Sequence, residues 1–151
     1  MNILYTDFTL KNKSLDIYVA GCNGNPHCMD CHNPESWDFN QGVEYNNKYL
    51  SYLKNRIKDF NILIDNIMIM GGEPLDQNYN ELIKMLLDFK QFNKDIWLFT
   101  RYEIEEISDD IVECCNYIKT GKYIPELKTD DNIQFNIRLA SSNQRIYKIE
   151  I

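Results

Sequence analysis

The sequence has no long apolar run and no cluster of positive charge. Its apolar stretches, such as residues 67–70, fall far short of the roughly 20 residues that a membrane-spanning helix needs. The net charge is −7 and the 16 Lys and Arg residues are scattered, which argues against a nucleic-acid partner. Residues 1–9 show no basic segment followed by an apolar stretch, so no secretory signal is visible. We therefore expect a soluble, cytoplasmic protein that binds neither membranes nor nucleic acid.

The sequence also lacks the even number of cysteines that a secreted disulfide framework uses. It has five cysteines, three of them within ten residues and two adjacent to each other later in the chain. This uneven spacing favours a metal site in a reducing compartment over disulfide bonds. With 151 residues the chain is long enough for one compact domain, and we expect a single domain over residues 1–151.

Strand and helix patterns alternate along most of the chain. Apolar residues recur at strand or helix spacing. We expect strands at residues 15–19, 67–70, 96–99, 117–119, 134–139 and 145–149, helices at 47–60, 79–92 and 103–114, and a turn at 141–143. This alternation is typical of an α/β fold with a mainly parallel sheet, whose ligands bind at the carboxyl ends of the strands. Too few units are present to close an eightfold barrel, so we expect an open or partial βα barrel.

Three cysteines lie on the loop that follows the first of these strands. Cys22, Cys28 and Cys31 share a segment that contains glycine and proline, so the chain can curl around one centre. Three thiolates would leave one iron of a 4Fe-4S cluster open to a substrate. Zinc is the alternative, with His27 or His32 as a fourth ligand. The adjacent Cys114 and Cys115 end an expected helix and are interpreted as core residues.

A second motif, Gly71-Gly72-Glu73-Pro74, follows the apolar strand at 67–70. Two glycines at a strand end allow the backbone to approach a ligand closely. Taken alone the motif is equally compatible with an ordinary turn in which Pro74 starts the next helix.

The two motifs in this order resemble those of the radical S-adenosylmethionine enzymes. Within that family, the segments 31–39, 99–102, 121–127 and 139–145 look like the activating proteins of anaerobic ribonucleotide reductases, which are glycyl-radical activases. The resemblance covers most of the chain. It implies a partial, open βα barrel of the minimal radical S-adenosylmethionine type.

The resemblance also implies two cofactors and the residues that hold them. Cys22, Cys28 and Cys31 would bind three irons of a 4Fe-4S cluster, and the amine and carboxylate of S-adenosylmethionine would chelate the fourth iron. The remaining residues implied to lie around this cosubstrate are Gly71, Gly72, Glu73, Pro74, Asp30, His32 and Thr100. One departure from the family pattern is the spacing of the first two cysteines, which five residues separate here instead of the usual three.

The activity implied by the resemblance is reductive cleavage of S-adenosylmethionine, followed by formation of a glycyl radical on an anaerobic ribonucleotide reductase. A flavodoxin or ferredoxin would donate the electron. Two other functions remain open at this point. One is a radical enzyme that acts on a small molecule or a peptide, and the other is a zinc-binding module without catalysis.

Overall fold

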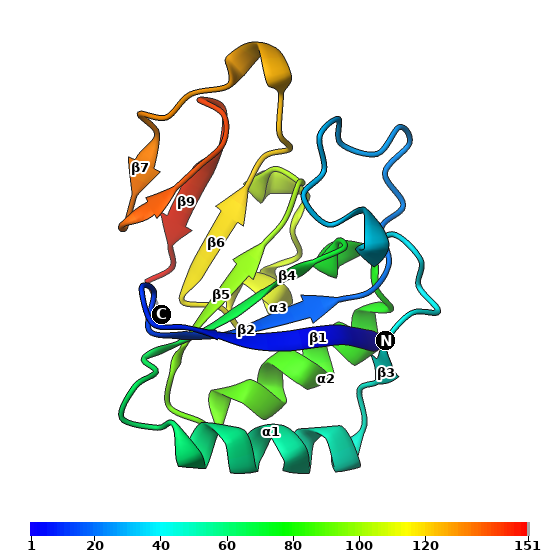
Figure 1. Ribbon diagram of the computed structural model, residues 1–151, viewed down its shortest axis with the longest axis vertical. Helices are drawn as coiled ribbons and strands as arrows, with labels where there is room; N and C mark the ends of the chain where they lie inside the picture. The colour runs from blue at the N-terminus through cyan, green and yellow to red at the C-terminus, as the bar shows by residue number, and fades with distance from the viewer. Residues whose placement is uncertain (151) are drawn as a thin grey trace.

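The computed structural model describes residues 1–150 and contains one seven-stranded sheet in the order β3-β1-β2-β4-β5-β6-β9 (Figure 1). Its four central strands run parallel: β2 (Ser14–Val19), β4 (Asn66–Gly71), β5 (Asp95–Phe99) and β6 (Tyr117–Thr120). The outer strands pair antiparallel with their neighbours: β1 (Asn2–Thr9), β3 (Val43–Glu44) and β9 (Arg145–Lys148).

Helices cover one face of this sheet (Figure 1). They are α1 (Asn47–Asp59), α2 (Tyr79–Lys90) and the short α3 (Asp109–Val112). The side chain of Asn46 caps α1 by accepting hydrogen bonds from the Lys48 and Tyr49 amides, and Asn78 caps α2 at the Glu81 amide. The apolar stripes of α1 and α2 pack on alternate residues of the parallel strands, and this contact forms the main hydrophobic core.

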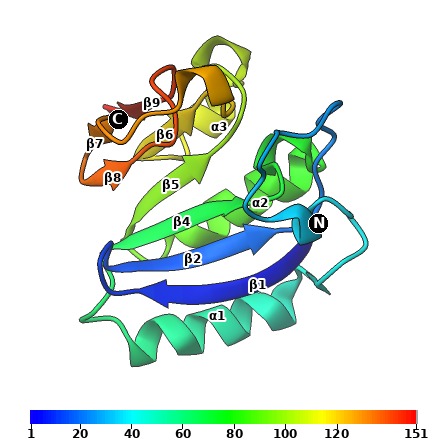
Figure 2. The same ribbon diagram turned by 45° about the horizontal axis from the view of Figure 1, so that its top comes forward.

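The opposite face of the sheet carries a smaller apolar cluster and remains partly open. On this face Trp97 stacks on Tyr117, with 3.9 Å between their ring centroids. The rings of Phe135 and Tyr117 pack in a T-shaped arrangement, with 5.2 Å between their centroids. Phe135 lies in the turn of a small hairpin formed by β7 (Ile133–Gln134) and β8 (Ile137–Arg138). Figure 2 shows that the strand direction turns progressively from β1 to β9, which places the hairpin above the plane of β1 and β2.

Most of the element predictions are confirmed. The structure is an α/β fold with a mostly parallel sheet, and the strands expected at 15–19, 67–70, 96–99 and 117–119 are the four parallel ones. The strand expected at 145–149 is β9, and the helices expected at 47–60 and 79–92 are α1 and α2. No closed barrel is formed by residues 1–150.

Three expectations about elements were wrong or incomplete. The helix expected at 103–114 is split into the 3₁₀ turn η3 (Ile104–Glu106) and α3, because Ile107 and Ser108 are extended. The strand expected at 134–139 is the β7–β8 hairpin, since Phe135 and Asn136 have φ values of 48° and 64° and turn the chain. In addition, neither β1 nor β3 was expected.

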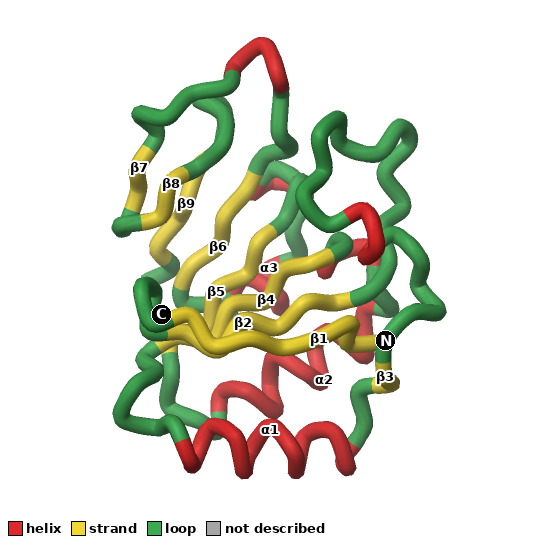
Figure 3. Tube along the Cα trace, in the orientation of Figure 1, coloured by secondary structure: helices red, strands yellow, loops and turns green. Residues whose placement is uncertain are grey.

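The loops that matter for function gather at the carboxyl ends of the parallel strands. Figure 3 shows the long loop between β2 and β3 at this end of the sheet, with the loops after β4, β5 and β6 beside it. That loop holds the three clustered cysteines and the 3₁₀ turn η1 (Pro34–Ser36). Within residues 1–150, none of the helices combines the length and the apolar character needed to cross a membrane.

Candidate functional site

A pocket of about 320 Å³ opens at the carboxyl ends of the parallel strands. It lies where ligands bind in open α/β sheets. Nine of the ten residues expected around the cofactors line it: Cys22, Cys28, Asp30, Cys31, His32, Gly71, Gly72, Glu73 and Thr100. Pro74 does not line the pocket, because it is buried at the first position of the 3₁₀ turn η2 (Pro74–Asp76).

The cysteine loop is fixed at its base and open at its tip. The backbone amide of Cys22 donates to the Trp37 carbonyl at 3.1 Å, and the amide of Cys31 donates to the Cys28 carbonyl at 3.2 Å. All three thiols are free and partly exposed. Burial raises the pKa of Cys22, and a hydrogen bond from the Gly24 amide to its Sγ opposes that shift.

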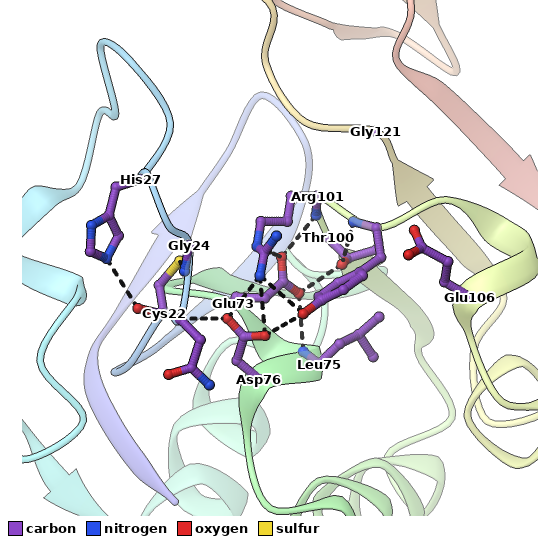
Figure 4. Close-up of polar contacts among 12 residues, drawn as sticks. Cys22, Gly24, His27, Glu73, Leu75, Asp76, Thr100, Arg101, Glu106 and Gly121 are labelled. Carbon is purple, nitrogen blue, oxygen red and sulfur yellow. Dashed lines mark hydrogen bonds and ion pairs between the residues drawn. The ribbon is translucent and has the colours of Figure 1, made fainter.

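The donor set fits an iron-sulfur cluster. Within residues 1–150, no three His, Cys, Asp or Glu side chains converge closely enough to hold a single metal ion. In a 4Fe-4S cluster each thiolate binds a different iron, so three thiols around the rim of one pocket suit it. His27, a candidate zinc ligand, is engaged elsewhere. Its Nε2 lies 3.1 Å from the Cys22 carbonyl oxygen (Figure 4). Its ring also stacks on the ring of Trp37.

The two glycines allow β4 to approach the cysteine loop. The Gly72 amide donates to the Val19 carbonyl and the Glu73 amide donates to the Gly21 carbonyl, both at 2.8 Å. A Cβ on Gly72 would lie 2.2 Å from the Gly21 oxygen, and Gly71 has a φ of 111°. Both glycines border the pocket, but the tight approach is between two segments of the protein's own backbone.

Hydrogen bonds to Glu73 connect the end of β4 to the segment directly after β5. Its side chain is 2% exposed and accepts hydrogen bonds from the Thr100 hydroxyl at 2.7 Å and the Arg101 amide at 2.8 Å (Figure 4). It also caps η2 at the Leu75 amide, 3.0 Å away. Burial raises the pKa of this carboxyl group, and the three hydrogen bonds oppose the shift. Glu73 therefore shapes the pocket wall by holding Thr100 in place.

Asp76 was not singled out from the sequence, yet it joins three segments of the site. It accepts hydrogen bonds from the Asn23 amide and the Tyr102 hydroxyl, both at 2.6 Å, and pairs with the Arg101 guanidinium at 3.4 Å. The cysteine loop is thus anchored to the segment after β5. The only local signal was an acidic residue three positions after Glu73.

Lys119, on β6, was also missed. Its Nζ donates to the Gly121 carbonyl at 2.7 Å and, more weakly, to the Thr100 carbonyl at 3.4 Å. Burial lowers the pKa of Lys119 to about 8, against the opposing charges of Glu73 and Cys28. The Lys119 side chain therefore forms part of the pocket wall.

The expected turn at 141–143 is confirmed and leads to Gln144, another pocket residue that the sequence did not reveal. The Gln144 Nε2 donates to the Gly121 carbonyl at 3.1 Å, and its Oε1 accepts from the Ala140 amide at 2.9 Å. The Gly121 carbonyl is thus shared by Gln144 and Lys119.

Comparison with known proteins finds similar chains and a matching family. The chain is similar to the anaerobic ribonucleoside-triphosphate reductase-activating protein of Haemophilus influenzae, with 28% identity over 141 residues that cover 89% of this chain and 87% of that protein. The protein of the same name from Pasteurella multocida is 27% identical, covering 87% and 85%, and that of Enterobacteria phage T4 is 27% identical, covering 87% and 81%. The model of the 4Fe-4S single cluster domain family matches residues 13–147, so the chain belongs to that family.

Proposed function

We propose that this chain is a radical S-adenosylmethionine activase that generates a glycyl radical on an anaerobic ribonucleotide reductase. One observation carries the proposal: Cys22, Cys28 and Cys31 open into the same pocket as Gly71 to Glu73. The relatives are named as proteins that activate an anaerobic ribonucleoside-triphosphate reductase, which supports this choice of protein substrate. The open, curved sheet is compatible with a partial βα barrel of the minimal radical S-adenosylmethionine type.

In this proposal Cys22, Cys28 and Cys31 hold three irons of the cluster, and the pocket beside them receives the cosubstrate. The chemistry that such a cluster would supply is one-electron reduction of the sulfonium of S-adenosylmethionine, which would yield methionine and a 5′-deoxyadenosyl radical. The chain's own residues bind and orient both groups. Asp30 and His32 border the mouth of the pocket, and Thr100 lies deeper on its wall, held by Glu73.

The walls of the pocket suit a reaction that must exclude stray hydrogen donors. Trp37, Met70 and Phe99 supply apolar surface beside the cysteines. Apolar walls displace water and so protect a reactive radical from side reactions. We propose a flavodoxin or ferredoxin as the electron donor. The five free thiols suit a reducing compartment, which we propose to be the cytoplasm.

The test is anaerobic reconstitution with iron and sulfide, then reduction in the presence of S-adenosylmethionine and measurement of 5′-deoxyadenosine. Wild-type protein should turn brown and form the product, and Ala variants of Cys22, Cys28 or Cys31 should lose both properties. Cys115→Ala is the matched control, since this thiol is buried in the core and should not bind iron.

Two results would contradict the proposed function and favour one of the alternatives. A colourless protein with one zinc and no product would favour the binding module without catalysis. Cleavage of S-adenosylmethionine without any radical on an added anaerobic reductase would favour a radical enzyme with a small-molecule or peptide substrate.

A further inference from the structure

The long spacer between the first two cysteines is not explained by the proposed function. Five residues, Asn23 to His27, separate Cys22 from Cys28. A longer loop loses more conformational freedom when it is ordered, and this loss opposes binding of both thiolates to one cluster. The spacer therefore needs contacts of its own that hold it in place.

His27 closes the spacer onto the residue at which the spacer begins. Its Nε2 lies 3.1 Å from the Cys22 carbonyl oxygen, and it is the donor in this pair because a carbonyl oxygen only accepts (Figure 4). The backbone is also tight at this point, since a Cβ on Gly24 would lie 3.2 Å from the His27 Cα. His27 does not line the pocket, so its contacts are with the cysteine loop and not with a ligand.

Trp37 holds the His27 ring from the other side of the loop. The two rings stack with 4.0 Å between their centroids and 12° between their planes. Trp37 is itself fixed, because its amide donates to the Pro34 carbonyl and its carbonyl accepts from the Cys22 amide. The same residue therefore holds the start of the spacer through its backbone and the end of the spacer through its ring.

The closed spacer places a hydrogen-bond donor on the first thiol. The Gly24 amide donates to the Cys22 Sγ at 3.5 Å. Hydrogen bonds to the ligand sulfurs are among the features that set the reduction potential of an iron-sulfur cluster. Such a donor stabilises the reduced cluster, which carries the more negative charge, and so raises the reduction potential.

We infer that His27 is a positioning residue that fixes the five-residue spacer and keeps the Gly24 amide on the Cys22 Sγ when the cluster is bound. This inference rests on the proposed function, which places the cluster on the three cysteines of this loop. Groups that orient a metal ligand affect both the affinity for the metal and its chemistry. His27 should therefore slow the loss of iron and raise the reduction potential of the cluster.

The experiment measures two properties of the cluster-loaded protein without S-adenosylmethionine. One is the rate of iron loss to a chelator, and the other is the midpoint potential from a redox titration followed by electron paramagnetic resonance. His27→Ala should lose iron about tenfold faster than wild type and have a lower midpoint potential. His27→Phe keeps the ring and loses the donor, so both of its values should lie between those of His27→Ala and wild type.

Two further variants show whether the stack with Trp37 is responsible. The double variant His27→Ala/Trp37→Leu should lose iron no faster than Trp37→Leu alone, because either substitution opens the same stack. Tyr117→Ala is the matched control, since it opens the stack of Trp97 and Tyr117, which has nearly the same geometry at 3.9 Å and 13°. This stack lies outside the cysteine loop, so the rate of iron loss and the potential should stay at their wild-type values.

Several results would overturn the inference. Wild-type values in His27→Ala would do so, as would equal changes in His27→Ala and Tyr117→Ala. Faster loss of iron at an unchanged potential would indicate a structural role only. If His27→Ala assembles no cluster, His27→Phe decides, and wild-type values in that variant would count against the inference. If the wild-type protein itself assembles no cluster, the proposed function fails as well, whereas the other outcomes leave it intact.

Discussion

Cys28 and Cys115 show how strongly the surroundings of a thiol decide its chemistry. Cys28 is partly exposed on a polar loop, and Cys115 is fully buried in the core under the helices. Burial raises the pKa of Cys115 to about 12. With this pKa, Cys115 is protonated at neutral pH, and its burial also shields it from reagents. It should therefore react slowly, since the thiolate is the reactive form of cysteine.

A thiol-labelling experiment on metal-free, folded protein should reflect this difference. We expect iodoacetamide at pH 8 to modify Cys22, Cys28 and Cys31 well before Cys115, as read by mass spectrometry of peptides. In urea all five cysteines should react. Labelling of Cys115 as fast as Cys28 in the folded protein would contradict the assignment of Cys115 to the core.

Glu73→Ala removes the acceptor shared by the Thr100 hydroxyl and the Leu75 and Arg101 amides. Buried donors without a partner cost about 1–3 kcal/mol, so the free energy of unfolding should fall by about that amount. Binding of S-adenosylmethionine should also weaken, because Thr100 loses its anchor, while the iron content stays the same. Urea denaturation measures the first effect and equilibrium dialysis the second.

Glu105→Ala removes an exposed carboxylate and serves as the control. A Glu73→Ala protein as stable as wild type, with the same affinity for the cosubstrate, would show that Glu73 does not shape the pocket.

At the scale of elements, the contact between the end of β4 and the cysteine loop should be sensitive to a single added carbon. In Gly72→Ala the new Cβ would lie 2.2 Å from the Gly21 oxygen and 2.8 Å from the Ser36 oxygen, both backbone atoms. Overpacking of this kind costs about 1–3 kcal/mol, and here it would push the cysteine loop away from β4. We expect lower stability in urea and reduced iron content after reconstitution.

Lys54→Ala, at an exposed position of α1 away from the cysteine loop, is the control for this variant. Full iron content and normal stability in Gly72→Ala would mean that β4 does not set the position of the loop.

Asp76→Asn should also weaken the attachment of the cysteine loop, here at its link to the segment after β5. The carboxylate of Asp76 accepts from the Asn23 amide and the Tyr102 hydroxyl and neutralises Arg101, and an amide cannot replace all three contacts. The expected result is faster loss of iron to a chelator from the cluster-loaded protein. Asp110→Asn, an exposed carboxylate that accepts from the Tyr79 hydroxyl, is the control. Equal rates in Asp76→Asn and wild type would refute the anchoring role.

The elements that could be predicted from the sequence are those with strong periodicity. The buried strands β2 and β4 and the amphipathic α1 and α2 repeat their apolar residues at regular spacing. Strand β1 could not be found in this way, because Ile3 is its only buried residue. The hairpin at β7 and β8 depends on the backbone conformation of Phe135 and Asn136, which apolar spacing does not reveal.

The residues of the site also fall into those that the sequence could predict and those that it could not. The cysteines and the Gly-Gly-Glu segment are local motifs, so their residues could be proposed from the sequence. Asp76, Lys119 and Gln144 contribute through contacts that span 53, 19 and 23 residues, respectively, to Asn23, Thr100 and Gly121. Such contacts depend on the order of strands in the sheet, and the spacing of motifs does not contain that information.

At the scale of the whole molecule, the two faces of the sheet have different tasks. The face under α1 and α2 is closed by the main core and supplies stability. The other face and the carboxyl ends of the parallel strands form the pocket, whose rim is built from the cysteine loop, the segment after β5 and the segment around Gly121. A pocket bordered by loops at one edge of the sheet is accessible to a loop of a protein substrate, which suits an activase.

The most direct test of this account is electron paramagnetic resonance of an anaerobic ribonucleotide reductase from the same organism, after incubation with the reconstituted chain, a reductant and S-adenosylmethionine. The account predicts a glycyl radical signal on the reductase that requires the cosubstrate and disappears with Cys22→Ala, Cys28→Ala or Cys31→Ala. Formation of 5′-deoxyadenosine without a radical on the reductase, or a radical that forms equally well with the cysteine variants, would contradict it.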